Sequence, residues 1–132
     1  MLYNAKLSLG DQQYDVIQCS YCFRRDVDSK GRPTSGIFGG TIELTIESST
    51  DTEILVAMLN NKYQAQHGAI RFFKSNDSNS LKTLVFNDGF IIAYQEHMDL
   101  SATHPMTIKF TISARKISVG EASHENDWPN HI

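Results

Sequence analysis

Strict alternation of apolar and polar residues is the feature that most constrains the fold of this chain. The segment Thr41–Glu47 reads TIELTIE, and the segment Met106–Ala114 also has an apolar residue at every second position. A period of two places successive side chains on opposite faces of an extended strand. The sequence therefore predicts β-strands with one face in a core and one face outside it.

The same period, interrupted by turn-forming residues, predicts the remaining strands. The expected strands cover residues 3–9, 13–26, 41–47, 68–74, 81–87, 90–98 and 105–119. In the second of these, the pattern groups Ile17, Cys19, Tyr21 and Phe23 on one face. The residues Asn87-Asp88-Gly89 indicate either a tight turn or a bulge within one long strand, and we favour the bulge.

One short helix interrupts the strands. Residues 50–53 have the spacing of a capping box, Thr-x-x-Glu, and Ile54, Leu55, Met58 and Leu59 fall on one helical face. The helix should end near Asn60, and so short a helix must dock on the sheet to be stable.

Length and pattern together predict a single domain over residues 1–132, with residues 120–132 as a polar C-terminal tail that is loosely held except at Trp128. The expected fold class is mainly β: an antiparallel β-barrel of two packed sheets with one short flanking α-helix. Residues 75–80 are expected to be a polar loop.

Residues 26–40 form a long segment rich in turn formers that also holds Ile37 and Phe38. Loops of this length are uncommon inside a compact domain and usually have a function. Two Thr-rich outer strand faces carry opposite charges, Glu43 and Glu47 on one and Lys109 and Arg115 on the other. They would be complementary if they met across a subunit boundary.

Charge and composition limit the classes of partner that we expect this chain to bind. The formal net charge is -3, and the basic residues are dispersed along the chain, so the electrostatic footprint of a nucleic-acid-binding protein is missing. The first thirteen residues have no long apolar run, which argues against a signal peptide or membrane anchor and for synthesis in the cytoplasm.

The residues that usually carry chemistry do not form a known site. Cys19 and Cys22 have the spacing C-x-x-C, but on a strand the two side chains point to opposite faces, and no second cysteine pair completes a metal site. The five histidines show no ligand spacing, and there is no P-loop or nucleophile elbow. We therefore expect no catalytic residues, no metal, no cofactor and no enzymatic activity.

Several segments in order resemble the Hcp family, also called TssD, which forms the tube of type VI secretion systems. The resemblance rests on residues 14–21, on residues 28–35 leading to Gly39-Gly40, on residues 105–116 and on the closing residues 125–129. Together these segments span most of the chain.

The resemblance implies a β-barrel subunit that forms homo-hexameric rings. Such rings stack into a hollow tube that a contractile sheath propels out of the cell, with effectors in the lumen or on a spike protein at the tip. It also implies that the long loop reaches the neighbouring ring, and the residues expected to do so are Lys30, Gly31, Arg32, Pro33, Thr34, Ser35, Ile37 and Phe38. Glu43, Glu47, Lys109 and Arg115 are expected on subunit-interface or lumen faces.

The competing interpretation is a monomeric β-barrel that binds a small apolar ligand. In that case a set of aromatic residues would line a pocket instead of filling a core: Tyr21, Phe23, Phe72, Phe86, Phe90 and Phe110. Filled cores are commoner in small barrels.

Overall fold

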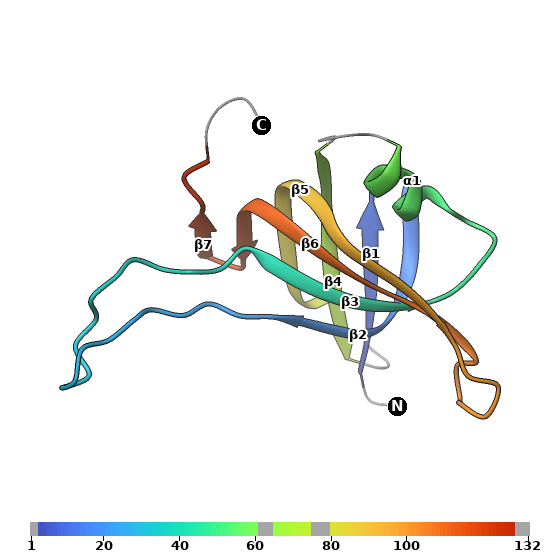
Figure 1. Ribbon diagram of the computed structural model, residues 1–132, viewed down its shortest axis with the longest axis horizontal. Coiled ribbons are helices and arrows are strands. Elements are labelled where there is room, and N and C mark those ends of the chain that lie inside the picture. Colours follow the sequence, from blue (N-terminus) through green and yellow to red (C-terminus); the bar gives the residue numbers. More distant parts are fainter. Residues whose placement is uncertain (1–2, 61–64, 75–79, 129–132) are drawn as a thin grey trace.

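The computed structural model describes residues 3–60, 65–74 and 80–128, and its strands form an antiparallel β-barrel (Figure 1). The elements are β1 (Tyr3–Leu9), β2 (Gln12–Tyr21), β3 (Thr41–Glu47), α1 (Glu53–Leu59), β4 (Gln66–Lys74), β5 (Ser80–Met98), β6 (Met106–Val119) and β7 (Ala122–Glu125).

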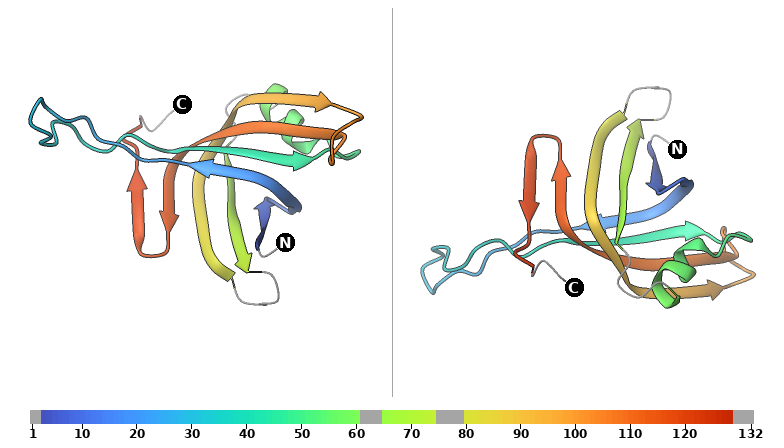
Figure 2. Two further views of the ribbon diagram at one scale, coloured as in Figure 1. Left: turned by 90° about the horizontal axis from the view of Figure 1, so that it is seen from below. Right: turned by 90° about the horizontal axis from the view of Figure 1, so that it is seen from above.

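Six strands close into the barrel and the seventh lies outside it. The order is β3-β2-β1-β4-β5-β6-β7, and a further pairing of β3 with β6 closes the circle. The expected mainly β barrel with one short helix is confirmed, and hydrogen bonding joins its two layers into one continuous sheet. The two views in Figure 2 show β7 beside β6, standing off the body of the barrel.

The barrel is filled by the apolar side chains that the alternation points inward. On β3, Ile42, Leu44 and Ile46 are buried, as the pattern predicts. Phe86 and Phe110 are fully buried and belong to the same cluster, which also includes Leu7, Leu9, Ile54, Ile70, Leu84, Ile91, Ile108, Ile112, Ala114 and Ile117. These two rings fill a core, which is the arrangement expected of a small barrel without an internal ligand.

Strand β2 departs from the prediction in two ways. Its pairing with β3 shifts register between Val16 and Gln18, and Val16 packs against the core instead of Ile17. The grouping of Ile17 with Cys19 and Tyr21 is therefore wrong, because the irregularity turns the residues before it to the other face. The strand also ends at Tyr21, five residues earlier than expected.

Strand β5 runs without a break through Asn87-Asp88-Gly89, so the predicted bulge is confirmed and the alternative turn is not present. Its pairing with β4 shifts between Gly68 and Gln66, opposite Phe86 and Gly89. Asp88 has a positive φ of 52°. A second shift, against β6, lies between Ile91 and Ala93.

Helix α1 begins without the predicted capping box. The N-cap residue is Thr52 and it makes no side-chain cap hydrogen bond. Instead, Asp51 Oδ1 accepts a hydrogen bond from the N–H of Glu53 at 2.8 Å, and its Oδ2 accepts one from the Tyr14 hydroxyl at 2.7 Å. Burial and this hydrogen bond raise the pKa of Tyr14. Ile54 buries the apolar face of the helix against the barrel.

The C-terminal segment is better ordered than the sequence suggests. The expectation of a loosely held tail is wrong for residues 122–125, which pair with β6 as β7. The Trp128 ring, excepted from that expectation, lies 5.9 Å from the ring of Phe90. Of the loop predicted at residues 75–80, residues 75–79 lie outside the described residues and Ser80 already begins β5. The end of the tail also lies outside the described residues. Within the described ranges, no helix has the length and apolarity needed to cross a membrane.

Candidate assembly surfaces

Residues 22–40, here called the arm, project far beyond the barrel (Figures 1 and 2). The arm is a ribbon of two extended segments. Arg24 and Phe38 exchange backbone hydrogen bonds of 2.9 and 2.8 Å, and the N–H of Thr34 donates to the carbonyl of Asp26 at 2.8 Å. The Arg24 guanidinium also lies 4.6 Å from the centre of the Phe38 ring. The long loop predicted from turn residues is therefore an internally bonded arm.

The tip of the arm is organised by one carboxylate. Asp28 accepts hydrogen bonds from the backbone N–H groups of Lys30 and Arg32, at 2.9 and 3.0 Å, and from Arg32 Nε at 2.9 Å. Gly31 supplies the positive φ, 84°, that the tight turn requires. These hydrogen bonds lower the pKa of Asp28 because they favour its charged form.

The root of the arm is fixed to the C-terminal segment by Asn126. Its side-chain amide donates hydrogen bonds to the carbonyl oxygens of Gly39 and Ala114, at 3.1 and 3.2 Å. Its Oδ1 lies 2.9 Å from His124 Nε2. Gly40 has a φ of +108°, and a Cβ there would lie 2.8 Å from the Ala114 carbonyl oxygen. The direction of the arm is thus set at its base by groups on three separate segments.

Aromatic contacts add to this attachment. The ring of Phe23, in the first residues of the arm, packs edge-on against those of Tyr21 and His124, with centroids 6.3 and 5.6 Å apart. A Cβ at Gly39 would lie 2.3 Å from the Phe23 ring. Glycine at position 39 therefore lets the two halves of the root approach closely.

The structure gathers the loop residues expected to reach a neighbouring ring. Lys30, Gly31, Arg32, Pro33, Thr34 and Ser35 lie at and near the tip, whereas Ile37 and Phe38 lie nearer the root. Ser35 Oγ accepts a hydrogen bond from the N–H of Asp26 at 2.9 Å. Contact of these residues with another ring remains a prediction.

Three of the four charged residues expected on outer strand faces lie together, and the fourth lies apart from them. On adjacent strands, Lys109 stands opposite Thr45, so it lies between Glu43 and Glu47 on one outer face. Arg115 lies apart from them. It pairs with Asp88 at 2.6 Å and with Glu125 in a second short contact, both within the same chain. A role of these four residues at a subunit boundary or lumen remains a prediction.

Two strand edges of the barrel lack a partner within the described part of the chain. Residues 16–21 of β2 pair only with β3, because β1 leaves β2 after the pair Lys6–Asp15. Residues 90–98 of β5 pair only with β6, because β4 leaves β5 at Gly89. These edges bound a four-stranded layer in the order β2-β3-β6-β5. Ile92, on the β5 edge, is 53% exposed.

The described ranges contain no candidate metal site. No cluster of three or more His, Cys, Asp or Glu side chains there is arranged to hold a metal ion. Both cysteines are free thiols: Cys22 is exposed and lies beyond the end of β2, while burial raises the pKa of the Cys19 thiol to about 11.

Sequence reasoning missed the role of Asn126 and the positions of the two unpaired edges. Asn126 belongs to the closing segment that carries the resemblance, but its partner Gly39 is 87 residues away. The strand edges could be located only after the pairing partners of β2 and β5 were known.

Comparison with known proteins identifies related sequences and folds. The model of the family described as hemolysin coregulated protein Hcp (TssD) matches residues 1–129. Hcp1 from Flavobacterium johnsoniae is a similar solved structure, with 32% sequence identity and a TM-score of 0.89, over 96% of this chain and all of that one (100%). The search of curated protein sequences gives no match.

More distant structures share the fold. Hcp1 from Salmonella typhimurium has a TM-score of 0.76 at 8% identity, over 95% of each chain. The tube terminating cap of the anti-feeding prophage has a TM-score of 0.58 at 15% identity, over 89% of this chain and 88% of that one.

Proposed function

Because this chain belongs to the Hcp (TssD) family of type VI secretion tube proteins, we propose that it forms hexameric rings that stack into a hollow tube. A contractile sheath propels this tube out of the cell, and the tube carries effectors in its lumen or on a spike protein at its tip. The role is structural, not catalytic, and the subunit leaves the cytoplasm through the secretion apparatus.

The observation that carries the proposal is the pair of unpaired edges on one strand layer. Exposed strand edges invite pairing with another chain, so proteins cover them or use them. The edge of β2 at residues 16–21 and the edge of β5 at residues 90–98 bound opposite sides of that layer. Joining one edge to the other edge of the next copy is a heterologous contact, and it leaves neither of these two edges free once the rotation closes.

The outer face of the same layer suits the wall of a channel. Its outward positions are mainly polar: Gln18, Ser20, Thr41, Glu43, Thr45, Glu47, Gln95, His97, Thr107, Lys109, Thr111 and Ser113. Such a face stays hydrated when it lines a lumen, and its mixed charges favour no single class of cargo. We assign Glu43, Glu47 and Lys109 to this face.

The edge contact is tested by placing a charge on it. Ile92→Lys puts a lysine on the unpaired part of β5, where charged edge residues oppose strand pairing. Val85→Lys is the matched control, since Val85 is 40% exposed on the same strand but pairs with both Ala69 and Ser118. We expect size-exclusion chromatography to show rings for the control and protomers for Ile92→Lys. Rings that form equally well in both variants would contradict the edge contact.

Stacking is tested on the arm. The double substitution Arg32→Asp and Ile37→Asp changes exposed or half-buried residues of the arm. It should leave hexamers intact but abolish tubes in negative-stain images. Unchanged tubes would refute the assignment of the arm to ring stacking.

A further inference from the structure

We propose that the turn between β5 and β6 of one copy docks in an apolar pocket at the arm root of the next copy along the tube, so that subunits meet head to tail. This rests on the proposed tube function and names the two surfaces through which consecutive rings make contact. The occupant of the pocket is thus a second copy of this chain.

The pocket lies between the arm and the hairpin formed by β6 and β7. It is lined mainly by apolar groups, with Phe23 and Ile37 on the arm side and Ile117, Val119 and Ala122 on the hairpin side, and it measures about 270 Å³. An opening of this size accommodates an aliphatic side chain. Its walls are held in place by the root contacts, so binding does not require the pocket to be built first.

The turn at residues 99–105 presents an apolar tip. Leu100 is 82% exposed, and Met98 and Met106 at the adjoining strand ends are 57% and 38% exposed. The Asp99 carboxylate accepts hydrogen bonds from the N–H and the hydroxyl of Ser101, at 3.0 and 2.7 Å. The turn is therefore internally bonded while it holds its leucine in solvent, and exposed methionines lie at both adjoining strand ends.

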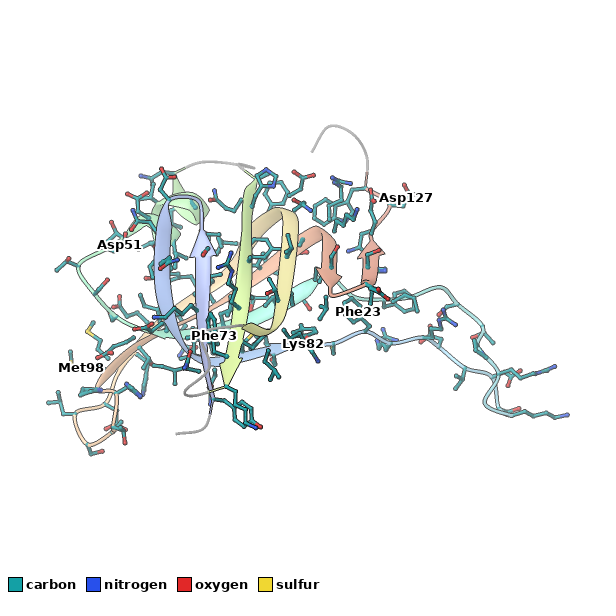
Figure 3. All side chains as sticks on the ribbon, turned by 180° about the vertical axis from the view of Figure 1, so that it is seen from behind. Phe23, Asp51, Phe73, Lys82, Met98 and Asp127 are labelled. Atoms are coloured by element: carbon teal, nitrogen blue, oxygen red, sulfur yellow. The ribbon has the colours of Figure 1, made fainter. Side chains whose placement is uncertain are left out.

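The two surfaces lie at opposite ends of the molecule. Figure 3 labels Met98, beside the turn, at one end of the barrel and Phe23, at the pocket, towards the other, where the arm projects. A feature at one end that fits a recess at the other produces a head-to-tail contact, which repeats indefinitely along an axis.

The charges at the two ends of the molecule also favour head-to-tail contact. The arm carries four basic residues, Arg24, Arg25, Lys30 and Arg32, against Asp26 and Asp28. The turn end carries Glu47, Glu96 and Asp99, and no Lys or Arg occurs between Glu96 and Met106. A head-to-tail contact brings unlike charges together, whereas joining two arm ends or two turn ends brings like charges together and leaves the pocket empty.

Disulfide trapping tests the contact directly. In a background with Cys19→Ser and Cys22→Ser, one preparation carries Leu100→Cys and another carries Val119→Cys, so that each ring holds a single kind of cysteine. After mixing and oxidation, intact mass spectrometry should find the dimer that contains one chain of each kind. A third preparation with Leu81→Cys, exposed to 60% and outside the pocket, is the control and should not couple to Val119→Cys.

A charge at the tip provides the second measurement. Leu100→Asp should leave the mass of single rings unchanged and weaken ring-to-ring association at least about tenfold, measured by sedimentation. If the wild-type protein forms rings but the mixed cysteine preparations give no mixed disulfide, or if tubes tolerate Leu100→Asp, the contact is overturned and the ring proposal stands. A wild-type protein that stays a protomer would contradict both proposals.

Discussion

Alanine at Gly40 should be far more damaging than alanine at other glycines with positive φ. Gly40 has a φ of +108°, and a Cβ there would lie 2.3 Å from Asn126 Nδ2 and 2.8 Å from the Ala114 carbonyl oxygen. Gly120 is the matched control, because it also has a positive φ, +59°, but a Cβ there would meet nothing within 4 Å. The comparison separates backbone strain from loss of the root contacts.

The expected losses of unfolding free energy follow from backbone strain and from the loss of hydrogen bonds. A non-glycine residue at Gly120 costs about 1–2 kcal/mol of unfolding free energy for the left-handed backbone. At Gly40 the strained backbone costs about 1–3 kcal/mol. Displacing Asn126 also removes its two hydrogen bonds, to Gly39 and Ala114, each contributing about 0.5–1.5 kcal/mol. We expect a loss of about 4 kcal/mol for Gly40→Ala against about 1 kcal/mol for Gly120→Ala.

Urea unfolding followed by circular dichroism measures both variants. They are compared at one protomer concentration, because assembly itself adds to apparent stability. For a domain of this size, a loss of about 4 kcal/mol lowers the urea midpoint by roughly 2 M. Equal losses in the two variants would refute the argument that close packing at the root, and not backbone conformation alone, requires glycine at position 40.

Three further predictions concern the arm tip, the thiols and the core. The pKa of Asp28 lies below its ordinary value of 3.8, so the bonds that organise the tip are complete above pH 3.8 and are lost as the pH falls through the lower, folded-state value. NMR titration should show the Arg32 amide shifting only in that acid range, and a transition near neutral pH would contradict this. At pH 8, iodoacetamide should label exposed Cys22 well before Cys19, whose pKa is raised to about 11, and equal labelling rates would refute the assigned burial. Phe110→Ala should cost about 3–5 kcal/mol in urea unfolding, because the ring is fully buried, and a loss below about 1 kcal/mol would contradict its place in the core.

The alternation of apolar and polar residues was sufficient to predict the barrel, but not the register shift in β2 or the existence of β7. Alternation placed Ile42, Leu44 and Ile46 inward correctly because each is adjacent to residues of the opposite kind, and the pattern needs no knowledge of the partner strand. The same rule failed at Ile17, since the register shift between Val16 and Gln18 depends on how β2 pairs with β3. Strand β7 was missed because a short polar segment becomes a strand only when β6 is beside it.

The assembly surfaces were predictable only in part. Turn-forming residues and the family resemblance indicated that residues 26–40 have a function. However, Asn126 acts on Gly39 across 87 residues, and no local pattern reports such a pairing. No sequence pattern singled out Leu100, which is 82% exposed in the turn after Met98. Figure 3 shows Met98 at the end of the barrel away from Phe23.

Native mass spectrometry of the wild-type protein tests the central claim most directly, namely that identical copies cover the open edges of β2 and β5. The account predicts a closed species of six chains, each of 14.9 kDa, at micromolar protomer concentration. A spectrum containing only the 14.9 kDa protomer, even at the highest concentration that stays in solution, would contradict it.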